Sequence, residues 1–303
     1  MRLLAVHAHP DDESSKAAAT CARYAAEGHE VTVLTCTGGE RGEVLNPSFP
    51  QRVASMEEMG RIRRAEMAEA ARILGVQHRW LGFVDSGMGT GALPQGCFAL
   101  QPPDRVLERM VAHVRALRPH VIVTYDENGG YPHPDHIATH RAAVAAFDAA
   151  ANPAVFPEAG DPWQPRKLYY VHIVTKDRVR ALHDGLLHHG MDSPFSDWLA
   201  GWDDAGNRPV TARVRCEQYF ERRNRALLAH ASQVDPASSW FAVPLEIQQA
   251  AWPTEEFELA RSVVPTIEAE TCLFAGLADA DAPTGAEVHS PTTNGRTYVN
   301  QLT

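Results

Sequence analysis

The chain has 303 residues, of which 44% are hydrophobic and 22% charged, as is ordinary for a globular protein with a sizeable core. Its formal charge of −10, from 28 Lys and Arg against 38 Asp and Glu, argues against nucleic-acid binding. No apolar run approaches the roughly 18 residues that span a bilayer, so no membrane partner is expected. Five scattered cysteines without paired spacing favour a reducing compartment, and we expect a cytoplasmic protein.

The first half of the chain alternates short apolar runs with longer amphipathic stretches. Strands are expected at 3–6, 31–36, 77–81, 121–125 and 167–174. Helices are expected at 14–26, 61–74, 104–117 and 135–151. Strands that alternate with helices of this length predict an α/β, Rossmann-like fold, in which a mostly parallel sheet is flanked by helices on both faces.

The pattern changes after about residue 175, where the chain becomes more helical and rich in tryptophan. We therefore expect a Rossmann-like core over 1–175 and a smaller helical or mixed portion over 176–274. This second portion is expected to pack over the edge of the sheet. From 275 to 303 the composition turns to Ala, Asp, Pro, Thr and Gly, which predicts a mobile tail with little to bury.

Two clusters of metal-binding residue types follow two of the predicted strands. His-Pro-Asp-Asp at 9–12 comes directly after the first strand, and His-Pro-Asp-His at 133–136 follows the strand at 121–125. Open α/β sheets bind their ligands beyond the carboxyl ends of the strands. The two clusters are therefore expected to meet and to form one metal site.

The spacing within the clusters predicts different roles for the individual residues. Two histidines and a carboxylate are a standard ligand set for catalytic zinc, and His9, Asp12 and His136 supply such a set. Asp11 lies between two of these ligands and must point elsewhere, which leaves it free to act as general base. His133 shares a helix face with His136, so one of them can bind the metal while the other meets the substrate oxygen.

Other interpretations use the same residues. The acidic run at 11–13 could cap a helix. The ligand set also suits ferrous iron, but the Fe(II) oxygenase triad usually occurs on an antiparallel jelly roll. A dinucleotide-binding module needs a glycine-rich turn after the first strand, where this chain has His-Pro-Asp-Asp. A binding or scaffold protein would leave Asp11 beside two ligands unexplained.

With these residues in view, the chain resembles the zinc-dependent N-acetylglucosaminyl deacetylase superfamily of the PIG-L type. The signature is Ala-His-Pro-Asp-Asp-Glu at 8–13 together with Pro-His-Pro-Asp-His at 132–136. Further stretches are similar to the amidase branch of this superfamily, at 12–16, 37–43, 80–87, 125–131 and 252–261. The resemblance covers roughly residues 3–276 and leaves the tail outside.

The resemblance implies a metal-dependent hydrolase that cleaves a linear amide C–N bond. It implies zinc, with ferrous iron as an alternative in the cell, on the ligands His9, Asp12 and His136. It also implies that Asp11 is the general base and that His133 faces the developing oxyanion. Asp135 would orient His133 as a carboxylate–histidine pair, and Tyr131 would bring a mobile hydroxyl to the same carbonyl.

The substrate that the amidase branch implies is a small-molecule thiol conjugate, in which an S-substituted N-acetylcysteine is joined to glucosaminyl-inositol. Family positions for sugar recognition fall on Glu43, Arg63 and Asp85. Lys16 is expected beside the site, and we hypothesise that it selects the larger amide. The alternatives are deacetylation of N-acetylglucosaminyl-inositol, or the same amidase chemistry in a natural-product pathway. Nothing in the sequence sets the number of subunits.

Overall fold

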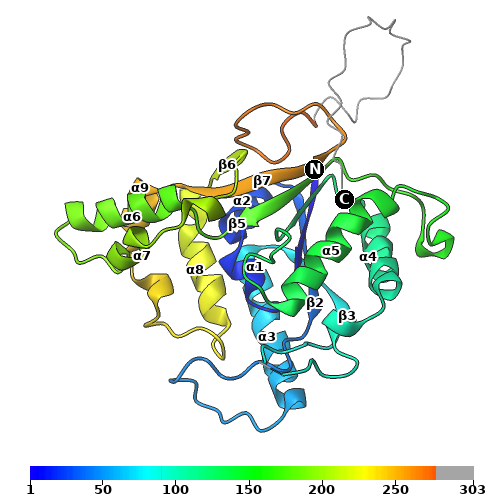
Figure 1. Cartoon of the computed structure of the whole chain (residues 1–303), viewed down its shortest axis with the longest axis horizontal. Coiled ribbons are helices and arrows are strands. Elements are labelled where there is room, and N and C mark those ends of the chain that lie inside the picture. The colour runs from blue at the N-terminus through cyan, green and yellow to red at the C-terminus, as the bar shows by residue number, and fades with distance from the viewer. Residues whose placement is uncertain (90, 278–303) are drawn as a thin grey trace, which may run out of the picture.

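The computed structural model describes residues 1–89 and 91–277, and a seven-stranded sheet runs through this part of the chain (Figure 1). The strands are β1 Arg2–His7, β2 Glu30–Thr37, β3 Gln77–Phe83, β4 Val121–Thr124, β5 Lys167–His172, β6 Ala212–Arg215 and β7 Thr254–Ser262. Their order in the sheet is β3-β2-β1-β4-β5-β7-β6. The first five strands are parallel, and β7 is antiparallel to both β5 and β6. The predicted α/β fold is confirmed.

Helices cover both faces of this sheet. The α-helices in the described part of the chain are α1 Asp12–Ser15, α2 Ala18–Ala26, α3 Met56–Leu74, α4 Pro103–Leu117, α5 Pro134–Ala149, α6 Lys176–His188, α7 Ser196–Ala200, α8 Phe220–Ala229 and α9 Leu245–Ala251. Tyr24 of α2 and Met67 of α3 pack on one face, whereas Met110 of α4 and Phe147 of α5 pack on the other. Because both faces are buried, β1 and β4 are continuous apolar runs rather than alternating ones.

Within the described residues, none of the helices combines the length and the apolar character that a bilayer crossing requires.

The helix expected at 14–26 is broken into α1 and α2. Ala17 adopts a φ of 61°, which is unfavourable for a residue with a Cβ, and α2 begins directly after it. The carboxylate of Glu255, on β7, accepts the N–H groups of Ala19 and Thr20 at 3.2 and 2.8 Å. N–H groups in the first turn of a helix have no acceptor within the helix itself. A cap from a distant strand therefore starts a new helix here, and the local sequence gave no sign of it.

The C-terminal half of the chain extends the same sheet. The sequence did not predict β6 or β7, and β7 pairs with β5 from Lys167 opposite Ser262 to His172 opposite Glu256. The division into 1–175 and 176–274 stays a prediction. Most of the expected tail, 278–303, lies outside the described residues.

Candidate active site

The site lies at the carboxyl edge of the sheet, between β1 and β4. These strands are neighbours, with Leu3 opposite Val121. From β1 the chain continues to β2 on one side, and from β4 it continues to β5 on the other side. The loops therefore diverge here, at the point where open α/β sheets place their ligands.

The turn after β1 is fixed by its own hydrogen bonds. The N–H of His9 donates to Asp12 Oδ2 at 2.9 Å, and the carbonyl of Asp11 accepts the N–H groups of Ser14 and Ser15 at 3.0 and 3.1 Å. Asp11 itself has a φ of 100°. This conformation turns consecutive carboxylates in different directions, as the sequence spacing suggested.

The turn after β4 brings the second cluster to the same place. The Nε2 atom of His136 lies 3.4 Å from Asp12 Oδ2, and the Nδ1 atom of His9 lies 3.6 Å from that same oxygen. All three side chains are at least nine-tenths buried. The structure thus brings together the three residues that the sequence indicated as ligands.

The donor atoms fit a divalent cation. His136 Nδ1 contacts the carbonyl of Gly129 at 2.9 Å, whereas its Nε2 atom is buried without a hydrogen-bond partner. Ligating histidines commonly use one nitrogen in this way and keep the other for the metal. His9, His133 and His136 also offer nitrogen atoms that all lie within 4.8 Å of one another. The described residues therefore contain a His/Asp cluster able to bind a metal ion.

Gly129 makes this arrangement possible. Its φ is +76°, and a Cβ built on it would lie 2.5 Å from the Cβ of His136. A larger residue would push the imidazole away from Asp12.

Several neighbouring groups stabilise the ionised carboxylate of Asp12. Its oxygens accept Lys16 Nζ at 2.5 Å and the Tyr125 hydroxyl at 2.7 Å. Burial alone raises the pKa of Asp12, but His136 and Lys16 outweigh it and hold that pKa well below its usual range. Lys16 is itself buried, so the structure places it against Asp12 rather than on an exposed helix face.

Tyr125 is a site residue that the sequence analysis missed. Its hydroxyl accepts the N–H of Ala8 at 2.7 Å while it donates to Asp12, and its ring stacks on His136 at 4.4 Å between centroids and 7° between planes. The available signal in the sequence was its position directly after β4, on the segment that leads to the second cluster.

Asp11 differs from Asp12 in its exposure. Its side chain is 27% exposed, against 3% for Asp12, and it faces the cavity described below. Arg63 Nη2 donates to Asp11 Oδ2 at 2.8 Å and to the carbonyl of Pro10 at 2.5 Å. Burial raises the pKa of Asp11 even though the Arg63 guanidinium opposes this. The carboxylate is therefore oriented but open to a ligand.

Asp135 is placed differently from the expectation. Its carboxylate contacts His9 Nε2 at 3.2 Å and accepts from the backbone N–H of Ser86 at 2.9 Å and from the Ser86 hydroxyl. Only its backbone N–H reaches His133, donating to Nδ1 at 3.1 Å. The carboxylate thus orients His9 and not His133, because the helix start at Pro134 turns the two side chains apart. Ser86, on the loop after β3, was not predicted.

A cavity of about 690 Å³ opens in front of these groups. Most of the expected substrate-facing residues line it, namely Asp11, Glu43, Arg63, Asp85, Tyr131 and His133. Apolar side chains complete the wall, among them Leu45, Met88, Leu93 and Pro94. Lys16 is absent from this lining.

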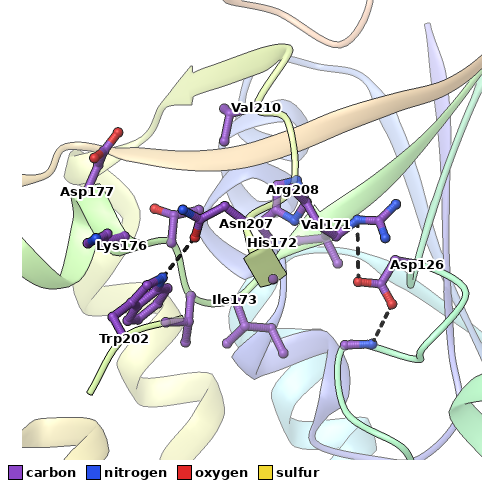
Figure 2. Close-up of a pocket in the computed structure, with 14 residues that line it drawn as sticks. Asp126, Val171, His172, Ile173, Lys176, Asp177, Trp202, Asn207, Arg208 and Val210 are labelled. Atoms are coloured by element: carbon purple, nitrogen blue, oxygen red, sulfur yellow. Dashed lines mark hydrogen bonds and ion pairs between the residues drawn. The ribbon is translucent and has the colours of Figure 1, made fainter. Parts of the chain in front are cut away.

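A second cavity of about 360 Å³ lies beyond the carboxyl ends of β4 and β5 (Figure 2). Several of its polar side chains bond to one another or to nearby backbone, as Figure 2 shows for Trp202 with Asn207 and for Arg208 with Asp126. His172 contacts the carbonyl of Pro209 at 3.1 Å. No residue of this cavity was a sequence candidate.

The first site defines a class of protein. A mostly parallel α/β sheet carries at its carboxyl edge a buried His/Asp cluster that can hold a cation, beside a partly exposed carboxylate that opens into a cavity. This is the arrangement of a metal-dependent hydrolase.

Comparisons with known proteins are consistent with this class. The family profile described as "GlcNAc-PI de-N-acetylase" (PIG-L) matches residues 4–147. The chain is 52% identical over 287 residues to the Mycothiol S-conjugate amidase of Streptomyces coelicolor, covering 92% of this chain and 98% of that one. It is 42% identical to the 1D-myo-inositol 2-acetamido-2-deoxy-alpha-D-glucopyranoside deacetylase of Geodermatophilus obscurus, over 91% and 98% of the two chains.

Among solved structures, N,N'-diacetylchitobiose deacetylase from Pyrococcus horikoshii has the same fold, with a TM-score of 0.59 and 18% identity, over 85% of this chain and 83% of that one. The chain belongs to the PIG-L family. It is an enzyme that hydrolyses an amide C–N bond.

Proposed function

We propose that the protein is a zinc-dependent amidase of mycothiol S-conjugates, which cleaves the amide between glucosamine and the N-acetylcysteinyl group. The products would be glucosaminyl-inositol and a mercapturic acid, as in the detoxification of electrophiles in the cytoplasm. The observation that carries the proposal is the open Asp11 carboxylate beside the buried cluster of His9, Asp12 and His136. The near full-length similarity to an amidase of this kind supports the substrate class.

Zinc would be held by His9, Asp12 and His136. When bound, it would polarise the amide carbonyl and make a nearby water more acidic. The chain's own residues prepare this position. Asp135 and Gly129 each occupy the second nitrogen of one imidazole, while Lys16 and Tyr125 fix the carboxylate. Such outer contacts orient ligands and are needed for tight metal binding.

Asp11 would act as the general base. It accepts a proton from the attacking water, the water oxygen bonds to the amide carbon, and the C–N bond then breaks. The leaving nitrogen must gain a proton, which Asp11 donates after taking it from the water. Arg63 supports this role because it fixes the orientation of the Asp11 carboxylate without closing it off from the cavity.

His133 would stabilise the oxyanion as a hydrogen-bond donor. Its Nδ1 atom accepts the N–H of Asp135, so the proton of the neutral imidazole must sit on Nε2. Burial lowers the pKa of His133 to about 4, which favours that neutral form. Tyr131 lies beside it, with a ring separation of 6.2 Å, and can bring its hydroxyl to the same carbonyl.

Substrate recognition would use polar residues of the cavity lining for the sugars. These residues are Glu43, Arg63 and Asp85. The apolar part of the lining, which includes Leu45 and Leu93, suits the S-linked group. For Lys16 we propose an indirect effect on substrate choice through Asp12, because its ammonium contacts that ligand at 2.5 Å.

The second candidate function is deacetylation of N-acetylglucosaminyl-inositol, favoured by the 42% identity to a deacetylase over 91% of the chain. A role in a natural-product pathway would use the amidase chemistry on another thiol conjugate. The direct test compares kcat/KM for a mycothiol S-conjugate with that for N-acetylglucosaminyl-inositol on one zinc-loaded preparation. We expect the conjugate to be preferred. A higher value for the acetamide would reverse the assignment and leave the enzyme class intact.

A further inference from the structure

Asp11 has an unusual backbone, and a buried pair of side chains lies against it. Glu13 and His230 are 1% and 0% exposed, and they come from opposite halves of the chain. We infer that His230, acting through Glu13, positions Asp11 for proton transfer. The inference rests on the proposed function, in which Asp11 is the base.

Each polar group of Asp11 is held. Its carboxylate accepts Arg63, and its carbonyl accepts the N–H groups of Ser14 and Ser15. Its N–H donates to Glu13 Oε2 at 2.9 Å. Since a φ of 100° is unfavourable for a residue other than glycine, the conformation persists only where surrounding contacts enforce it. The Glu13 contact is the one that holds the N–H in this rotated position.

Glu13 is fixed in turn by two donors on its other oxygen. His230 Nε2 lies 2.7 Å from Glu13 Oε1, and the Ser14 hydroxyl donates to the same atom at 2.5 Å. These two contacts fix the orientation of the Glu13 carboxylate, so that its Oε2 atom faces the Asp11 N–H.

His230 is delivered from the end of α8. The following residues anchor it, because Ser232 donates through both its N–H and its hydroxyl to Glu66 of α3, at 2.7 and 2.8 Å. The imidazole therefore cannot easily swing away from Glu13. Its Nδ1 atom has no partner, so the single contact with Glu13 is its polar interaction among the described residues.

A purely structural role for the pair predicts a different outcome from a positioning role. A structural pair would affect stability and metal content together, and its loss would lower activity whether or not Asp11 is present. A positioning pair acts through Asp11 and loses its effect when that carboxylate is removed. The distinction can be measured as coupling between substitutions.

The experiment measures kcat, KM, metal content and thermal unfolding for His230→Leu in the wild-type and Asp11→Ala backgrounds, with zinc bound and a mycothiol S-conjugate as substrate. We expect His230→Leu to lower kcat about 30-fold with KM within about two-fold, and with metal content unchanged. His230→Gln keeps a donor near the Nε2 position and is expected to recover most of the loss. In the Asp11→Ala background, His230→Leu should change residual kcat less than about two-fold.

A matched control is His183→Leu on α6, which removes another histidine contact, with Ser193 at 2.8 Å. It should leave kcat unchanged. If His230→Leu does not fold, Glu13→Gln carries the same test, since the amide replaces one of the two accepting oxygens. Equal losses in both backgrounds, or full activity of His230→Leu while Asp11→Ala is inactive, would overturn the positioning role alone. Full activity of Asp11→Ala would overturn the proposed base and this inference with it.

Discussion

Two cavities at the carboxyl edge of one sheet differ in what their polar groups can still do. Asp11 presents to the first cavity a carboxylate that is 27% exposed, and behind it His136 Nε2 is buried without a hydrogen-bond partner. In the second, Trp202 bonds Asn207 and Arg208 pairs with Asp126 (Figure 2), and Arg208 also bonds Glu127 and Glu258. A cavity by itself is therefore no evidence of an active site. Polar atoms that converge on one point and are free to bind a ligand are such evidence.

Topology accounts for the difference. The first cavity lies beyond β1 and β4, where the connections leave in opposite directions and the loops separate. The second lies beyond β4 and β5, and the segment that contains Arg208 folds across it. Backbone and side chains from that segment bond Asp126, His172 and Trp202. Substitutions at the first site and in the second cavity test whether the two differ in this way.

The largest effect is expected for His136→Ala. Loss of a ligand removes the cation, and turnover should fall by about 1,000-fold or more, since metal chemistry contributes several kcal/mol. Metal analysis after dialysis and kcat measure the two consequences. A variant that kept both metal and turnover would show that the cluster around Asp12 is not the metal centre.

Asp11→Ala should separate metal binding from turnover. We expect zinc content to stay at the wild-type level while kcat drops about 10²- to 10⁴-fold, the usual contribution of a general base. Asp11→Asn serves as the control for shape. Loss of metal in both variants would instead make Asp11 a ligand.

Ser86→Ala tests the contacts behind the ligands. Without its hydroxyl, Asp135 loses one of the partners that keep it on His9, and metal affinity or activity should fall about 10- to 100-fold. A chelator titration measures the affinity. An unchanged titration would mean that the Ser86 backbone N–H is sufficient.

Lys16→Ser should shift substrate preference by about 10-fold toward the smaller acetamide. The measured quantity is the ratio of kcat/KM for the two substrates, so that any loss of activity common to both substrates cancels. Lys16→Arg, which keeps the charge, should retain the wild-type ratio. An unchanged ratio in Lys16→Ser would refute the selective role.

The smallest effect is expected in the second cavity. Arg208→Met should leave kcat/KM within about two-fold, because this cavity takes no part in the proposed chemistry. It should lower the free energy of unfolding by about 1 kcal/mol, as partly exposed ion pairs contribute little. A large loss of turnover would assign the second cavity a role in the reaction.

The sequence by itself determined much of this site. Apolar runs and breaks predicted five parallel strands, and the positions of His9, Asp12 and His136 after two of them predicted that these side chains lie together, as they do. This works because period and spacing are local properties, and because the carboxyl ends of parallel strands must meet at one edge.

Only the tertiary structure decided the contacts between distant segments. Glu255 of β7 splits the first helix, Asp135 turns to His9 rather than to His133, and His230 reaches Glu13 across 217 positions. None of these partners has a local pattern, since each depends on which loops the finished fold brings together. Local sequence patterns thus predict the His/Asp cluster, whereas tertiary packing determines which residues orient its side chains.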